Sequence, residues 1–197
     1  PETDAAPKSV AATRRVVLEN GVTLLLKSDP RSEVFGATVL FRNRSFAEPP
    51  GKCGIAELWQ RVLSRGPAGM ADGEFEEAMN GLGLSLQFVD NPYIPMDDMY
   101  LSPRYSFIKA EGLDENWREN LELIADVLAD PKLTDEALAE AKKSLGQVLG
   151  MKSASTRQRA RIAMYRALFG DHPLAKPVEG AMPEMMRVTV EDLQEFA

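Results

Sequence analysis

The clearest pattern of apolar and polar positions lies in residues 54–67, GIAELWQRVLSRGP. Apolar residues recur there at the spacing of one helical face: Ile55, Leu58, Trp59, Val62 and Leu63. The opposite face carries Glu57, Gln60 and Arg61. The pattern predicts an amphipathic helix over residues 54–65, which Gly66-Pro67 ends.

Strand patterns precede this helix. Residues 14–27 form two apolar runs around Asn20-Gly21, and Asn-Gly between such runs is a strong signal of a β-hairpin. Residues 34–41 are almost continuously apolar, which favours a long and well-buried strand.

A second helix and two more strands are expected in the middle of the chain. Asp72 can cap the helix, whose core side is expected to carry Phe75, Met79 and Leu82. Residues 84–90 alternate apolar and polar side chains, as a half-buried strand does. Residues 99–110 are expected to form another strand, with Pro103 at an edge or a bulge.

The C-terminal half has the pattern of successive helices. The first covers residues 114–129, and its inward residues are expected to be Leu121, Ile124, Ala125 and Leu128. A second begins after Thr134, and a third spans residues 156–169. Thr189 can cap a last helix that stops at Ala197. Because so short a helix is marginal unless it docks or continues, we expect the native protein to run on past Ala197.

These elements predict an α+β fold, a two-layer domain with a mostly antiparallel sheet and helices packed on one side. Residues 1–13 are rich in Pro, Ala and Thr and have the composition of a linker. We therefore expect the domain to cover residues 14–197, as a fragment of a longer chain.

Charge limits the classes of partner. The chain has 30 acidic and 23 basic residues and a net charge of −7, which argues against general attraction to nucleic acid or an anionic membrane. Four arginines gather locally at Arg157, Arg159, Arg161 and Arg166, and their spacing fits the solvated side of a helix. We expect neither nucleic acid nor membrane as a partner.

Two residue types that could have a chemical role occur once each in the chain. Cys53 is the only cysteine, so it has no internal disulfide, and the sequence shows no base that would activate it as a nucleophile. His172 is the only histidine and lies between a predicted helix end and Pro173, which favours a capping or packing role. Neither residue indicates a metal site or a cofactor.

The order of the elements and six local phrases resemble the insulinase-like zinc peptidases, the family that includes pitrilysin and the mitochondrial processing peptidase. The phrases are LENGVTLLLKSDP, AEPPGKCGIAEL, GEFEEAMNGLGLSLQ, LELIADVLADPKL, ALFGDHPLAKPVEG and VTVEDLQEF. They occur in the family's order across residues 14–196. The resemblance implies the metallopeptidase half-domain fold of that family.

The resemblance also implies where an active site would lie. In the family's H-x-x-E-H motif, two histidines bind zinc and the glutamate takes a proton from the metal-bound water. The first histidine falls on Glu57, the glutamate on Gln60, the second histidine on Arg61 and a more distant glutamate ligand on Gln147. A carboxamide is no base and a guanidinium offers no lone pair, so a degenerate site without metal or cofactor is predicted.

Three interpretations of the function follow. In the first, the chain is a non-catalytic domain that supports or encloses the peptide chamber of an active homologous domain or subunit, with peptide as a further ligand. In the second, it is an independent enzyme that uses other residues. In the third, it is a structural protein like the core subunits of respiratory complexes. Self-association stays open, and a bacterial periplasm or cytoplasm is the expected compartment.

The three polar residues of the first helix have two interpretations of their own. Without the family, they are an ordinary solvated helix face. With it, Glu57 and Arg61 form an acid-before-base pair four residues apart, and our hypothesis is that this pair fills the face in place of the metal.

Overall fold

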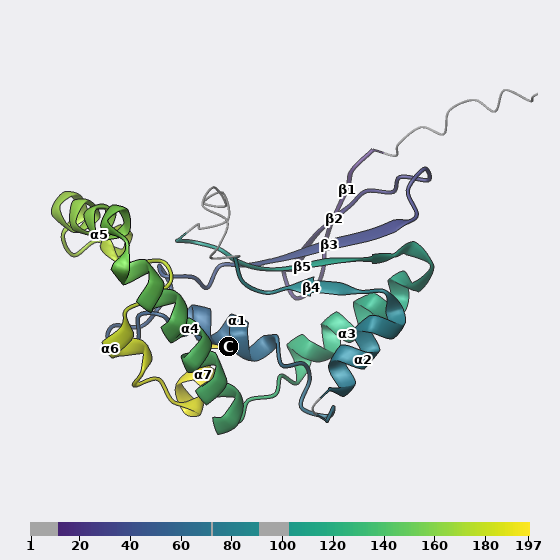
Figure 1. Cartoon of the computed structure of the whole chain (residues 1–197). Helices are drawn as coiled ribbons and strands as arrows, with labels where there is room; N and C mark the ends of the chain where they lie inside the picture. The colour runs from purple at the N-terminus through teal and green to yellow at the C-terminus, as the bar shows by residue number, and fades with distance from the viewer. Residues whose placement is uncertain (1–11, 72, 91–102) are drawn as a thin grey trace, which may run out of the picture.

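The computed structural model describes residues 12–71, 73–90 and 103–197. A three-stranded sheet forms one layer, and helices cover one of its faces (Figure 1). The strand order is β3 (Val34–Phe41), β5 (Ser106–Leu113) and β4 (Ser85–Gln87), and both pairings are antiparallel. This arrangement confirms the predicted α+β class.

The helices under the sheet come from two parts of the chain. They are α1 (Ile55–Leu63), α2 (Glu74–Leu82) and α3 (Trp117–Ala129), the last preceded by the 3-10 turn η2 (Asp114–Asn116). The N-terminal cap of α2 is Gly73, and the proposed cap Asp72 lies outside the described residues.

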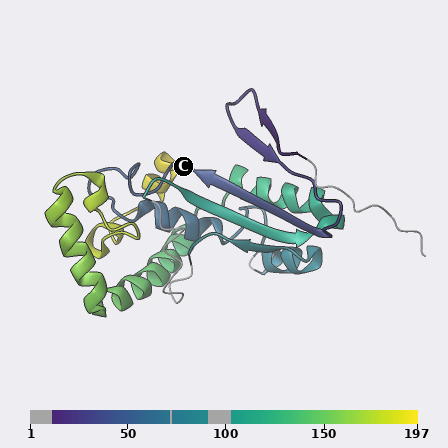
Figure 2. The same cartoon turned by 90° about the horizontal axis from the view of Figure 1, so that it is seen from above.

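The remaining helices form the other end of the molecule (Figures 1 and 2). They are α4 (Asp135–Ala154), α5 (Thr156–Phe169), η3 (Pro173–Ala175), α6 (Met182–Met185) and α7 (Val190–Phe196). The predicted cap Thr189 is confirmed, because it closes a capping box with Asp192. The helix predicted to begin after Thr134 does so, and Thr134 accepts the Ala137 N–H. No described helix combines the length and the apolar content needed to cross a bilayer.

The predicted hairpin is present as β1 (Arg14–Val17) and β2 (Thr23–Leu26). Gly21 takes a positive φ of 85° in the turn, and Asn20 accepts a hydrogen bond from the Val22 N–H. The hairpin forms a two-stranded sheet of its own and projects from the larger sheet (Figure 2). Most of the predicted linker before it lies outside the described residues.

The expectation that residues 34–41 are well buried is wrong. Alternate residues of β3 are exposed, and Val34 and Leu40 are 62% and 64% exposed. Phe35 and Val39 on the other face pack against the core. Helices cover only one face of the described sheet, so alternate residues of β3 face outward, Val34 and Leu40 among them.

Of the strand predicted at residues 99–110, residues 99–102 lie outside the described residues, and β5 begins at Ser106 and ends at Leu113. Pro103 precedes β5, where its carbonyl accepts the Phe46 N–H at 3.0 Å. The strand continues to Leu113 because it pairs with β3 over the full length of that strand, with Val34 opposite Leu113. The strand predicted at residues 84–90 is reduced to β4, which pairs with β5 over only three residues.

The inward face of α3 is rotated by one position from the prediction. Leu121 and Ala125 are exposed, and the buried positions are Asn120, Leu123, Ile124 and Val127. Asn120 takes a core position because its side-chain amide donates to the Leu113 carbonyl at 3.4 Å. The buried face of α3 therefore combines Leu123, Ile124 and Val127 with one polar residue that is bonded to the end of β5.

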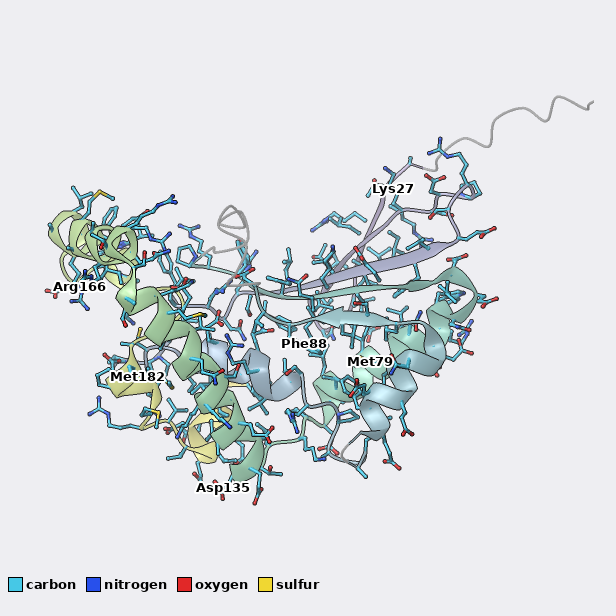
Figure 3. All side chains as sticks on the ribbon, in the orientation of Figure 1. Lys27, Met79, Phe88, Asp135, Arg166 and Met182 are labelled. Carbon is cyan, nitrogen blue, oxygen red and sulfur yellow. The ribbon has the colours of Figure 1, made fainter. Side chains whose placement is uncertain are left out.

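The core is built around α1. Ile55, Leu58, Val62 and Leu63 are fully buried and join one cluster with the sheet and with α3, α4 and α7. Figure 3 shows Phe88 between the sheet and α1, and Met79 on the neighbouring α2. Because the helix is covered on every side, its polar residues are enclosed as well.

Candidate functional site

The N-terminus of α1 is held by a close backbone contact and a buried carboxylate. Gly54 and Gly180 have φ values of 108° and 110°, and a Cβ on Gly180 would lie 2.5 Å from the Gly54 Cα. Glu48 accepts the N–H groups of Gly54 at 2.9 Å and Ala56 at 3.3 Å. Burial raises the pKa of Glu48 to about 7, although these two N–H groups oppose the rise.

Glu57 lies in a buried ion network rather than on a solvated surface. It is 5% exposed, and Arg44 Nη2 donates to its Oε1 at 2.5 Å. The same nitrogen donates to Asp90 Oδ2 at 3.0 Å, and Arg61 Nη2 lies 3.6 Å from Glu57 Oε2. Two cations and two carboxylates therefore meet beside α1. The interpretation of an ordinary solvated helix face is wrong.

The pKa values of the two arginines shift in opposite directions. Burial lowers the pKa of Arg44, but the charges of Glu57 and Asp90 outweigh it and raise that pKa overall. Burial lowers the pKa of Arg61, the positive charge of Arg44 adds to this effect, and Glu57 opposes it. Arg44 is thus the principal partner of Glu57, and Arg61 is the weaker one.

Gln60 is 2% exposed and its carboxamide is fully engaged. In the orientation that satisfies its hydrogen bonds, its nitrogen donates to the carbonyls of Phe88 and Phe107, each at 2.9 Å. Its oxygen accepts from Ser106 Oγ at 2.9 Å. The side chain ties α1 to the sheet, and it has no group that could take a proton from water.

Arg61 is enclosed but weakly bound. Its side chain is 12% exposed, Nη1 donates to Ser144 Oγ at 3.5 Å, and Nε has no hydrogen-bond partner among the described residues. Gln147 lies one turn after Ser144 on α4, is exposed, and makes no hydrogen bond with the other motif positions in the described structure. The structure thus brings together Glu57, Gln60 and Arg61, and it shows no hydrogen bond from Gln147 to them among the described residues.

Arg44 and Asp90 are the residues that sequence reasoning missed. Arg44 follows β3 and Asp90 follows β4, so both lie in connecting segments where a charged residue is ordinarily solvated. Only the pairing of both strands with β5 brings them to α1. No local signal in the sequence marks either residue.

The side chains at this site do not fit zinc. The carboxylates of Glu57 and Asp90 are both bound to Arg44, and two guanidinium groups surround the position of the motif. Guanidinium has no lone pair for a metal and repels a dication. The described residues contain no group of three or more His, Cys, Asp or Glu suited to holding a metal ion.

The surroundings of Cys53 and His172 favour a structural role over a chemical one. Cys53 is buried, and burial raises the pKa of its thiol to about 12, with the charges of Glu48 and Glu184 adding to the rise. A thiol with such a pKa is a poor nucleophile at neutral pH. His172 Nδ1 accepts the Leu174 N–H at 3.2 Å, and its ring packs edge-on against Phe46. This confirms the predicted capping and packing role of His172.

Fold and site together define a two-layer α+β domain whose central helix carries a closed ion network in place of an open catalytic face. The family profile described as insulinase, peptidase family M16, matches residues 23–182. The chain belongs to this family, which confirms the resemblance seen in the sequence.

Similar proteins come from bacteria. An uncharacterized zinc protease of Rickettsia bellii is 22% identical over 163 residues, which are 83% of this chain and 37% of that protein. A non-peptidase homolog of Helicobacter pylori is 23% identical over 158 residues, 80% of this chain and 34% of that protein. The chain thus spans little more than a third of these curated relatives.

A crystal structure of a peptidase M16 inactive domain from Pseudomonas fluorescens has the same fold. The TM-score is 0.81 at 20% identity, and the match covers 94% of this chain and 43% of that one. At this identity the match shows the fold alone.

Proposed function

We propose that the chain is a non-catalytic member of the family that supports or encloses the peptide chamber of an active homologous domain or subunit. The observation that carries the proposal is the ion network at Glu57, where guanidinium groups stand at the position of the motif. Two similar proteins support it by their names, one a non-peptidase homolog and the other an inactive domain.

The geometry supports a domain without a step of zinc-dependent hydrolysis. Such hydrolysis needs a metal to polarise the peptide carbonyl and a base to activate water. Arg44 and Arg61 fill the surroundings of Glu57, and the Gln60 carboxamide is bound to backbone carbonyls and Ser106. These side chains instead join α1 to the segments that follow β3 and β4, which is a structural role.

Co-assembly with an active homologue tests the proposal. The probe is a family member with an intact H-x-x-E-H motif from the same organism, assayed on a fluorogenic peptide library alone and with this chain. We expect the two proteins to co-elute and peptide cleavage to rise at least about tenfold, because a completed chamber orients the substrate.

A partner whose motif glutamate is changed to glutamine is the control. Cleavage in the mixture should then fall to background, since the partner holds the catalytic groups. Cleavage that persists with this inactive partner would show that the chain is itself a peptidase. Failure to co-elute, with unchanged cleavage, would remove the supporting role.

A further inference from the structure

A cavity of about 480 Å³ lies at the end of the molecule formed by α4 and α5. Its walls are the last turns of α4, the middle of α5 and the segment from Leu174 to Met182. Figure 3 shows Arg166 on α5 and Met182 at the start of α6, both at this end. None of the four motif positions lines the cavity, so the inference below is independent of the proposed function.

The shape of the cavity follows from the two segments that enclose it. One wall is fixed to the core, because Gly180 packs on Gly54 too closely for any side chain. The other wall is α5, a helix without a single buried residue. Since α5 fills no space inside the core, the volume between it and residues 174–182 stays open.

The lining combines apolar walls with an excess of positive charge. Most of the surface comes from apolar residues that include Leu149, Ile162, Leu174 and Val178. Four basic residues also line it, namely Lys152, Arg161, Arg166 and Lys176, against the single acid Glu179. This local excess contrasts with the net charge of −7 of the whole chain.

Glu179 neutralises only part of that charge. It is buried and pairs with Lys152; burial raises its pKa, but the charge of Lys152, with a smaller contribution from Arg161, outweighs burial and lowers the pKa overall. Lys176 donates to the Glu48 carbonyl at 3.3 Å, and its positive charge also acts on the buried Glu48 carboxyl, where it opposes the rise of the pKa. Arg166 makes no ion pair with any described residue.

The arginines on α5 divide into two groups. Arg161 and Arg166 line the cavity, whereas Arg157 and Arg159 are exposed and take no part in it. The prediction of a solvated face therefore holds for Arg157, Arg159 and Arg166 and is wrong for Arg161, which is half-buried. The same helix supplies both the site residues and a matched control.

We propose that this cavity binds a small organic carboxylate with an apolar body. A volume of this size is in the range of small-molecule sites, which are mostly apolar and have a few placed polar groups. The carboxylate meets the guanidinium of Arg166, whose planar group matches it with two parallel hydrogen bonds, and Arg161 adds its positive charge from the same helix. The apolar body lies against Ile162 and Val178.

Titration calorimetry on the 197-residue chain tests the proposal. The carboxylate probes are octanoate, as a free acid, and acetyl-leucyl-leucine, as a peptide C-terminus; the comparison ligands are octanol and inorganic phosphate. We expect saturable binding of at least one carboxylate, with octanol at least about tenfold weaker because it lacks the charge. Phosphate should give no saturable binding because it has no apolar part.

Paired variants locate the site. Arg161→Gln/Arg166→Gln should weaken carboxylate binding at least about tenfold, whereas Arg157→Gln/Arg159→Gln should stay within about twofold, although both remove the same charge. Arg166→Gln alone, at an exposed residue, keeps the test valid if the first pair impairs folding, and should weaken binding about threefold or more.

Four results would overturn the proposal. They are no saturable binding of either carboxylate, equal binding of octanol, phosphate binding as tight as that of the carboxylates, and equal losses in the two paired variants. The difference between octanoate and acetyl-leucyl-leucine then tells whether the cavity accepts a free acid or a peptide end.

Discussion

At the scale of single residues, Arg44 is the cation that links two separate segments at the centre of the molecule. Its guanidinium is 3% exposed and joins two carboxylates that come from α1 and from the segment after β4. A buried ion pair adds little net stability, but removal of one partner leaves a charge without compensation in a dry site. The network is therefore sensitive to single changes.

We predict that Arg44→Met lowers the free energy of unfolding by about 3–5 kcal/mol, since Glu57 and Asp90 lose their closest cation. Urea unfolding followed by circular dichroism measures it. The control is Arg31→Met, which removes the exposed 2.7 Å pair with Asp29 and should leave the free energy of unfolding nearly unchanged. Equal losses of unfolding free energy in the two variants would show that the Arg44 network stabilises the fold no more than an exposed ion pair does.

The raised pKa of Glu48 predicts that the stability of the fold depends on pH. Its pKa is about 7 in the folded protein and 4.5 in the unfolded chain, so between these values the folded state binds more protons. Stability should therefore fall as pH rises from 4.5 to 7, by about 3 kcal/mol for this group. Glu48→Gln should remove this part of the slope in urea unfolding measured across that range. Glu76→Gln, at an exposed site on α2, is the control, and an unchanged slope in Glu48→Gln would contradict the prediction.

At the scale of elements, α1 depends on the segment that follows α5. Gly54 and Gly180 touch through their backbones, and the Ala181 N–H donates to the Cys53 carbonyl at 3.2 Å. Residues far apart in the chain thereby fix the start of the helix that carries the motif positions. Glycine is favoured at both positions, because each has a positive φ and a Cβ would lie 2.5 Å from backbone at Gly180 and 3.1 Å from the Met185 Cβ at Gly54.

Gly180→Ala should lower the free energy of unfolding by more than about 2 kcal/mol, since it adds backbone strain and a Cβ 2.5 Å from the Gly54 Cα. Gly150→Ala, in α4 with nothing within 4 Å of its Cβ, should instead raise it by up to about 1 kcal/mol. Thermal unfolding of the two variants compares the effects directly. A Gly180→Ala protein as stable as the parent would show that the contact with Gly54 relaxes freely.

At the scale of the whole molecule, the closed site separates this chain from a zinc peptidase by more than its motif. Restoring the four motif positions would leave Arg44 in place, bound to the sheet side of the site by Asp90. Its positive charge would stand beside any metal held at residue 57. A residue outside the motif thus also opposes metal binding at this position.

We therefore predict that Glu57→His/Gln60→Glu/Arg61→His/Gln147→Glu does not bind zinc stoichiometrically, and that the parent chain does not either. Adding Arg44→Ala to that variant should tighten zinc binding at least about tenfold, since it removes the repulsive charge. Metal analysis after dialysis and a zinc titration measure both. Circular dichroism must show that each variant is folded. Equal zinc affinity with and without Arg44 would contradict the role assigned to it.

Much of the fold follows from local signals. The stripe from Ile55 to Leu63 predicts α1, Asn20-Gly21 predicts the hairpin, and the caps Thr134 and Thr189 predict two helix starts. Each depends on side-chain spacing or on hydrogen bonds within a few residues, which the sequence contains by itself. The family's phrases likewise lie in order along the chain, so the family was predictable from them.

Tertiary structure decided what depends on distant partners. β5 extends to Leu113 because β3 pairs with it, and Asn120 faces inward because the Leu113 carbonyl accepts from it. The sequence places Glu57, Gln60 and Arg61 on one helical face, but only the packing of the strands brings Arg44 and Asp90 to them. From sequence alone, a charged residue is predicted to be solvated. Its burial depends on which parts of the folded chain pack against it, and its local sequence does not contain that information.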